Sequence, residues 1–470
     1  MIKYCPYCDK PIEETDKYCN YCKKPLVSSI PRKDPPIDKS LHPYTYMQND
    51  EVTYEYNDII DDERIEQQIK EVNKKIEKGQ DLGESIGNLL LIKASLYYQK
   101  RDLNTASKIL EIALNSFKNE NNLVNVAICH NELGLIQEDL GYFDNAIFQF
   151  DRAIELLKQI NDTNRLLKVY NNIANIYFLI EDLENSYEFY QKAITLAREE
   201  NLILEEVKSS SNLVDVLFLL NDYEFIGKIL DRNAFIFNQT GNINGTINTL
   251  IKYGKLNFNL GEKFYDKAIK LLNEALDLIH KISTNLNPYN RARMMWEGQY
   301  LLGKIYLKLD DYKISENYFQ QSLESLRTFE LGDSIDQAAV LEELGNLFYL
   351  KMEYSKAIEY LDLSVEIYHK FGKDQKIGLI KDQIGQIIID SNGDQLEAIR
   401  FFEESLEMFE KLNYEKKVAD MLQKLGDVYI NSGMIELAID NFKRAKIVYQ
   451  ELKDDYNVNL IAEKIYSLEN

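Results

Sequence analysis

The sequence predicts an all-α protein, a superhelical stack of helical hairpins preceded by a small element that contains four cysteines. Two observations lead to this prediction: a recurring segment and two closely spaced cysteine pairs. The segment at residues 132–160 has the pattern of two helices joined by a tight turn at Gly141, and similar segments follow one another along the chain. They align on one residue that is usually small: Ala94, Gly134, Ala174, Val214, Gly254, Gly303, Gly345, Gly385 and Gly426. The successive intervals of 40, 40, 40, 40, 49, 42, 40 and 41 residues are typical of an array of helical hairpins.

The cysteines predict a zinc site near the start of the chain. Residues 4–26, which read YCPYCDKPIEETDKYCNYCKKPL, contain two Tyr-Cys-x-Tyr-Cys units with the ligand set Cys5, Cys8, Cys19 and Cys22. Two tight turns with this spacing can each present two thiolates and complete a tetrahedral site for one Zn²⁺. The segment resembles the short zinc ribbons at the N-termini of many prokaryotic and archaeal proteins. Four thiolates leave no open coordination position, so we expect a structural zinc that stabilises residues 1–26.

The residues between the ribbon and the repeats form two segments with different sequence patterns. Residues 27–58 contain four prolines and few periodic apolar positions, which predicts a disordered Pro-rich linker. In residues 59–83 the apolar side chains recur every three or four positions, and this pattern predicts an N-terminal capping helix with a polar outer face.

The repeats fall into two groups. We expect repeats one to five over residues 84–283 and repeats six to nine over residues 284–455, followed by a C-terminal capping helix at 456–470. The interval of 49 residues separates the groups, and its extra residues lie around Pro288. Proline suits the first position of a helix, so we predict a hinge or kink there and a new helix that begins at Pro288.

Within each repeat the residue sizes alternate in a fixed way. If the aligned small residue is position 8, position 11 is often aromatic, position 20 is often Ala, position 24 is bulky and position 27 is small again. Small residues let two helices approach closely, and bulky ones fill the groove that the neighbour leaves. Repeat two shows the pattern with Gly134, Ala146, Phe150 and Ala153. These residues resemble the tetratricopeptide repeat (TPR) over residues 84–455, and the period of 40 residues in place of the family's ~34 implies lengthened helices.

The TPR resemblance implies where a ligand would bind. In that family the first helices of the repeats line an inner surface that holds peptides or other proteins, and positions 2, 5, 9, 12 and 13 share one stripe of the first helix. The candidate peptide-binding residues of repeats three and four are Lys168, Asn171, Asn175, Lys208, Ser211, Asn212 and Asp215. Asparagine amides donate and accept hydrogen bonds, so they suit an extended peptide backbone, and the lysines suit a carboxylate. The alternative is an ordinary solvated polar face.

Charge favours some partners over others. The formal net charge is −22; residues 1–33 carry +3, which leaves −25 for the remainder. Such a body disfavours nucleic acid and anionic membranes, and it favours basic partners if charge contributes beyond solubility. The later repeats add an acidic stripe of this kind, made of Glu342, Asn346, Asp382, Gln386, Gln423 and Asp427. The chain shows no apolar run of the ~18 residues that a membrane span needs and does not begin with a signal peptide, so we expect a cytoplasmic protein.

Catalytic motifs are not apparent. Cys129 and His130 are neighbours, but adjacent residues on a helix point about 100° apart, so we interpret them as core residues. We therefore expect no catalytic residue, and a non-catalytic scaffold that binds a protein or peptide while the ribbon contacts a second surface. The alternative is a nucleic-acid-associated regulator in which the ribbon contacts nucleic acid and the array senses a partner. The sequence leaves open the partner, the biological process, the oligomeric state and whether the zinc ribbon docks on the groove of the repeat array.

Overall fold

The computed structural model describes residues 3–4, 11–12, 62–78, 85–282, 288–328 and 334–469. The predicted zinc ligands Cys5, Cys8, Cys19 and Cys22 and the predicted linker, residues 27–58, lie outside the described residues. Near the start of the chain two short strands, β1 (Lys3–Tyr4) and β2 (Pro11–Ile12), pair antiparallel with Lys3 opposite Ile12.

From residue 62 onwards the described chain is a succession of helices that pack in pairs. The first half comprises α1 (Asp62–Lys78), α2 (Ile86–Gln99), α3 (Leu103–Asn119), α4 (Leu123–Asp139), α5 (Phe143–Ile160), α6 (Thr163–Leu179), α7 (Leu183–Glu199), α8 (Ile203–Leu220), α9 (Tyr223–Thr240), α10 (Ile243–Asn259), the short 3-10 helix η3 (Glu262–Phe264) and α11 (Tyr265–Lys281). The second half comprises α12 (Pro288–Lys308), α13 (Tyr312–Thr328), α14 (Ile335–Leu350), α15 (Tyr354–Lys370), α16 (Asp374–Asp390), α17 (Gln395–Lys411), α18 (Glu415–Asn431), α19 (Ile435–Glu451) and α20 (Asp455–Glu469). The predicted all-helical hairpin solenoid is thereby confirmed for residues 62–469 as far as they are described.

A recurring turn ends one helix and starts the next. At Asn161 the backbone is left-handed, with φ of 56°, and the N–H of Asp162 donates to the carbonyl oxygen of Leu157 at 3.0 Å. The carboxylate of Asp162 then accepts a hydrogen bond from the backbone N–H of Arg165 at 3.1 Å and caps α6. Asparagine tolerates the left-handed region and aspartate is a favoured N-cap, so an Asn-Asp pair closes one helix and opens another.

Close packing inside each hairpin explains the small residue at position 8. A Cβ atom built on Gly134 would lie 2.6 Å from the ring of Phe150, and one built on Gly426 would lie 2.5 Å from the ring of Phe442. Both phenylalanines are fully buried. The two helices of a hairpin therefore approach closely enough that the aromatic ring of the second helix occupies the space of a missing side chain on the first.

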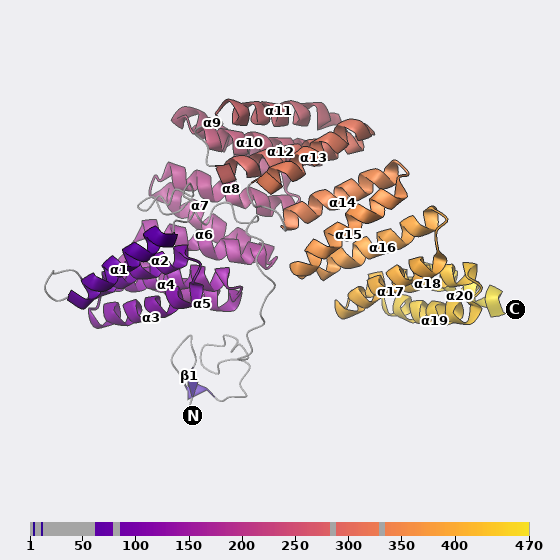
Figure 1. Ribbon diagram of the computed structural model, residues 1–470, viewed down its shortest axis with the longest axis horizontal. Helices are drawn as coiled ribbons and strands as arrows, with labels where there is room; N and C mark the ends of the chain where they lie inside the picture. The colour runs from indigo at the N-terminus through magenta and orange to yellow at the C-terminus, as the bar shows by residue number, and fades with distance from the viewer. Residues whose placement is uncertain are drawn as a thin grey trace.

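The stacked hairpins form an arch (Figure 1). Helices α1 to α8 make one limb, α9 to α13 the crown, and α14 to α20 the other limb. The stack is continuous across the 49-residue interval, because α12 contacts both α10 and α11. Helix α12 begins at Pro288 and has 21 residues, where the other first helices have 14 to 18. The limbs approach each other where Glu181, after α6, lies 3.9 Å from Lys373, before α16.

Candidate binding surface

The first helices of successive repeats contact each other through a ladder of polar pairs. In each rung a residue at position 6 of one repeat binds a residue at position 5 or 9 of the preceding repeat. The rungs are Asn172–Asn131 at 3.0 Å, Lys252–Asp215 at 2.7 Å, Glu343–Lys304 at 3.3 Å, Gln383–Asn346 at 2.5 Å, and Lys424–Asp382 at 2.5 Å. We call the surface formed by α4, α6, α8, α10, α12, α14, α16 and α18 the first-helix surface. The predicted binding stripe left out position 6, from which the predicted set took only Asn212, although polar residues at position 6 recur at the repeat interval.

In repeats three and four most of the predicted binding residues are packed between helices. Asn171 is 1% exposed, and its amide donates to the carbonyl oxygen of Leu167 at 3.2 Å and to the hydroxyl of Ser209 at 2.9 Å. Asn175 accepts a hydrogen bond from the hydroxyl of Tyr190. Asn171, on α6, is therefore hydrogen-bonded to α8, and Asn175, on the same helix, to α7.

The serine and asparagine predicted on α8 are buried as well. The hydroxyl of Ser211 accepts a hydrogen bond from the amide of Asn233, on α9, at 3.0 Å. Asn212 is 7% exposed and interacts with Tyr190. Of the predicted set, Lys168, Lys208 and Asp215 are half-buried and form the accessible rim, with Lys208 3.1 Å from Glu205.

A buried lysine that the sequence reasoning did not single out holds this region together. Lys252, on α10, is 4% exposed, and its Nζ donates to the backbone carbonyl of Ser211 and to the carboxylate of Asp215, both at 2.7 Å. An ammonium group loses much of its hydration in such a place, so it needs both acceptors. The sequence did contain a signal for it. Lys252 is at position 6 of its repeat, and position 6 is polar in most of the other repeats as well.

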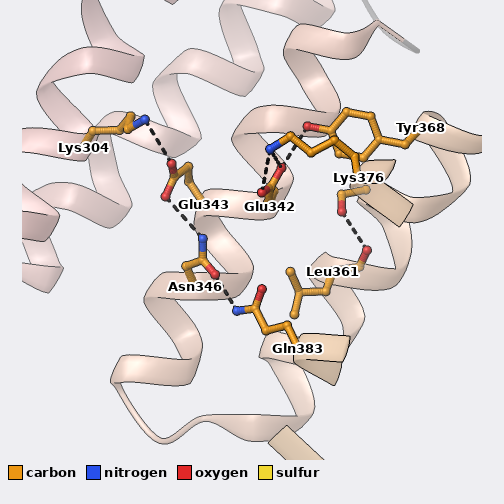
Figure 2. A network of polar contacts seen from close by, with 9 residues as sticks. Lys304, Glu342, Glu343, Asn346, Leu361, Tyr368, Lys376 and Gln383 are labelled. Carbon is orange, nitrogen blue, oxygen red and sulfur yellow. Dashed lines mark hydrogen bonds and ion pairs between the residues drawn. The ribbon is translucent and has the colours of Figure 1, made fainter. Parts of the chain in front are cut away.

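The predicted acidic stripe of the later repeats is already paired with lysines. Glu342 lies 3.0 Å from Lys376, and the carboxylates of Asp382 and Asp427 each lie 2.5 Å from a lysine, Lys424 on α18 and Lys464 on the last helix, α20. Glu342 also accepts a hydrogen bond from the hydroxyl of Tyr368 at 2.9 Å (Figure 2). These three carboxylates therefore contribute little net charge to the first-helix surface.

A cavity opens on the first-helix surface where the crown meets the second limb. Its volume is about 510 Å³, and it lies between α10, α12 and α14, lined by Phe258, Lys304, Leu307, Lys308, Asp310, Glu343, Asn346 and Leu350. Lys304 pairs with Glu343, which in turn accepts a hydrogen bond from the amide of Asn346 at 3.4 Å (Figure 2). The Nζ of Lys304 also lies 5.7 Å from the centroid of the Phe258 ring, within reach of a cation–π contact. The cavity thus combines an apolar floor with positioned charges.

The Cys129–His130 pair has the character of a core pair, as predicted. Burial, followed by the nearby Glu132, raises the pKa of the Cys129 thiol to about 12, so the thiol stays protonated near neutral pH. Burial also lowers the pKa of His130, whose Nδ1 lies 2.6 Å from the amide oxygen of Gln149. A neutral buried thiol is a poor nucleophile.

Two further properties concern the described part of the chain. Among the described residues no three histidine, cysteine, aspartate or glutamate side chains come together as a metal site. None of the described helices is both long enough and apolar enough to cross a membrane.

Comparison with known families identifies the repeats. Residues 71–217 match the family model of the soluble NSF attachment protein (SNAP), and residues 293–370 and 419–446 match models of the tetratricopeptide repeat. The chain therefore contains TPR repeats, with a SNAP-like TPR domain in its first half, and the predicted TPR resemblance is confirmed. No curated protein matches the chain in sequence.

Solved structures share the architecture. The apo form of the quorum sensor NprR from B. thuringiensis is 12% identical with a TM-score of 0.50, and the match covers 87% of this chain and 99% of that chain. A Signal Transduction ATPase with Numerous Domains (STAND) protein with a tetratricopeptide repeat sensor, from Pyrococcus horikoshii, is 16% identical with a TM-score of 0.50, over 76% of this chain and 55% of that chain. At these identities the likeness establishes the fold.

Proposed function

We propose that this chain is a non-catalytic scaffold that binds a peptide or a protein segment along its first-helix surface. The observation that carries the proposal is the cavity between α10, α12 and α14. Its volume of about 510 Å³ lies in the range of pockets that hold ligands, and it offers both an apolar floor and lysines. Lys308 is exposed beside it, whereas Lys304 is fixed by Glu343. A segment with an apolar side chain next to a carboxylate or a carbonyl fits this combination.

The second proposed contact is the rim of repeats three and four. Lys168, Lys208 and Asp215 lie at this rim, half-buried, above Asn171, Asn175, Ser211 and Asn212. The buried amides and hydroxyls hold α6, α8 and α9 in place, and rim residues on a rigid support are better placed to bind than residues on mobile elements. A segment that spans both contacts would run along the ladder from repeat three to repeat seven.

The experiment is a selection of random peptides on the immobilised full-length chain, followed by fluorescence anisotropy with the selected peptides. The test variant is Lys304→Ala with Lys308→Ala. Its matched control is Lys228→Ala with Lys443→Ala, two exposed lysines on the second helices α9 and α19. We expect the test variant to weaken binding at least about tenfold, ~1.4 kcal/mol, and the control to stay within about twofold. A chain that selects no peptide, or equal losses in both variants, contradicts the proposal.

The proposed second module is the N-terminal ribbon, with one structural Zn²⁺ held by Cys5, Cys8, Cys19 and Cys22. The spacing of the four cysteines supports it. Elemental analysis of the full-length chain should give about one zinc per chain, and Cys19→Ser should abolish zinc binding while the far-UV circular dichroism of the helical body stays unchanged. Retention of zinc by the variant, or a cooperative loss of helix, contradicts the independent ribbon. Mobility shifts of the full-length chain with DNA and RNA at several salt concentrations test whether the ribbon contacts nucleic acid instead of protein.

A further inference from the structure

An exposed apolar row runs along the ends of the first helices in the middle of the arch. It is formed by residues at the last turn or C-cap of α6, α8, α10, α12 and α14: Ile180, Leu219, Leu220, Leu260, Leu309 and Leu350. We call it the apolar edge. Each of these side chains is between 41% and 54% exposed. Single exposed leucines are ordinary on protein surfaces, but a row that recurs at position 13 or 14 of five successive repeats is a patch.

The contacts between first helices place these residues in spatial order. α6 contacts α8 through Asn171 and Ser209 at 2.9 Å, and the Nζ of Lys255, on α10, lies 4.5 Å from the ring centroid of Phe218, on α8. The cavity between α10, α12 and α14 brings Leu350 next to the residues that precede Leu309. Since each row residue occupies the same end of its helix, the side chains follow one another along one edge of the arch.

The apolar edge is confined to repeats three to seven. At the same positions repeat one has Gln99 and Lys100, repeat two has Asp139 and the half-buried Leu140, and the last two repeats have Asp390, Ser391, Asn431 and Ser432. The packing of a hairpin therefore does not require an apolar residue there, because repeats one, eight and nine close with polar ones. About half of each row side chain faces solvent, and covering that half removes apolar surface from water at about 25 cal/mol per Å².

The charges beside the apolar edge indicate the character of the partner. Within three residues of the row stand seven carboxylates and three lysines, a net charge of −4. Glu181, Asp222, Glu262 and Asp310 are exposed there. An apolar strip with an acidic border complements a strip of apolar side chains with basic residues on either side.

The spacing of the repeats matches a helical partner. Packed helices lie about 8–10 Å apart, and seven residues of an α-helix rise about 10.5 Å. A partner helix that lies across the ends of α8, α10 and α12 would therefore place an apolar residue at every seventh position over successive repeats. We infer that the apolar edge binds a basic amphipathic helix of a protein partner, with its apolar stripe on Leu219, Leu260 and Leu309. This inference rests on the proposed function of the chain as a binding scaffold and names its partner class.

The test uses the full-length chain and three fluorescein-labelled peptides of about 18 residues, a length of about five helical turns. The first has a leucine stripe and a lysine face, the second has the same composition in scrambled order, and the third has glutamate in place of lysine. The row variant is Leu219→Ser, Leu260→Ser and Leu309→Ser. Its matched control is Ile112→Ser, Phe235→Ser and Ile447→Ser, which removes side chains that are 57%, 62% and 56% exposed on the second helices α3, α9 and α19.

Fluorescence anisotropy should show that the leucine–lysine peptide binds at least about tenfold more tightly than the other two, which is ~1.4 kcal/mol. The row variant should weaken that binding at least about tenfold, while the control variant stays within about twofold. Equal binding of the scrambled peptide, tight binding of the glutamate peptide, or equal effects of the two variants overturns the inference. If the row variant binds the leucine–lysine peptide as tightly as the unsubstituted chain while library-selected peptides still bind, the inference fails and the scaffold function stands. If no peptide of any kind binds, both fail.

Discussion

Repeats three to five and repeats six to nine fill the space between their helices with different kinds of residues. In the later group one continuous hydrophobic cluster extends from Trp296 to Ile465. The polar side chains buried in it are mostly serines that donate to backbone carbonyls, such as Ser315 to Gly303 at 2.8 Å. In repeats three to five the apolar side chains form separate clusters, and asparagine, glutamate and lysine side chains lie buried beside them.

The polar ladder passes through both groups, and it shows that the charged residues of the two groups differ in how far they are buried. Lys252 and Lys424 occupy the same position 6 and bind aspartates of the preceding repeat, at positions 9 and 5, but the lysine side chains are 5% and 40% exposed. Water can replace the lost partner of an exposed lysine, whereas a buried lysine or its partner is left without compensation. A rung whose lysine is buried, such as that of Lys252, should therefore stabilise the stack more than a rung whose lysine is exposed, such as that of Lys424.

The largest expected effect comes from breaking the buried rung. Asp215→Ala takes the carboxylate away from the buried ammonium of Lys252, and we expect the free energy of unfolding to fall by about 3 kcal/mol. Asp382→Ala should cost less than about 1 kcal/mol, because water can hydrate Lys424, whose side chain is 40% exposed. Urea denaturation, with hydrogen exchange of α8 and α18 as the local readout, measures both. Equal losses would show that burial does not distinguish the two rungs.

A second test concerns the packing that the groups have in common. Gly426→Val should destabilise the chain by about 1–3 kcal/mol, because its side chain would overlap the ring of Phe442, 2.5 Å from the Cβ position. Repeat four carries valine at this position, and Val214 and Leu230 are buried in one cluster. The double variant Gly426→Val with Phe442→Leu should therefore recover part of the loss. Thermal denaturation checks this, and a double variant less stable than the single one contradicts the size-matching argument.

The Gly426–Phe442 pair also marks what the sequence could predict. Contacts within one hairpin depend on residues 16 positions apart, so the period and the alternation of sizes were enough to predict the fold, the nine pairs of helices found among the described residues, and the core role of Cys129 and His130. The stripe at positions 2, 5, 9, 12 and 13 was assigned from the geometry of a single helix. Whether Asn171 on that stripe is exposed depends on how closely α8 stacks beside it, which one helix cannot reveal. The ladder at position 6 was missed for the same reason.

Acidic pH provides a third, smaller test of the buried charges in the earlier group. Glu206 accepts hydrogen bonds from Arg232 at 2.7 and 2.8 Å and from Arg198 at 2.6 Å. Burial alone would raise the pKa of Glu206, but the two arginines outweigh it and hold the pKa below the ordinary value of 4.5. A lowered pKa in the folded state stabilises the protein above pH 4.5, and this contribution disappears as the pH falls through the lower folded value.

Glu206→Gln should therefore lower the free energy of unfolding by about 1–3 kcal/mol at pH 7. The difference from the unsubstituted chain should shrink as the pH falls below about 4.5. The matched control in the later group is Glu397→Gln, since Glu397 is 52% exposed and lies 4.0 Å from Arg400. It should change stability by less than about 0.5 kcal/mol at every pH. A difference for Glu206→Gln that stays constant with pH would show that the carboxylate charge does not stabilise this region.

The smallest expected effect concerns the ion pair between Lys373 and Glu181, which joins the two limbs of the arch. Lys373 and Glu181 lie 3.9 Å apart with side chains that are 37% and 79% exposed, so the pair should contribute less than about 0.5 kcal/mol. If contacts between successive repeats determine the arch, as expected for a solenoid, Lys373→Glu should leave the radius of gyration from small-angle scattering unchanged. Lys263→Glu, which makes the same charge change at an exposed lysine of η3, is the control. An expansion in Lys373→Glu alone would show that contact between the two limbs helps to determine the shape of the arch. The earlier and later repeats would then stabilise each other directly and not only through their neighbours in the stack.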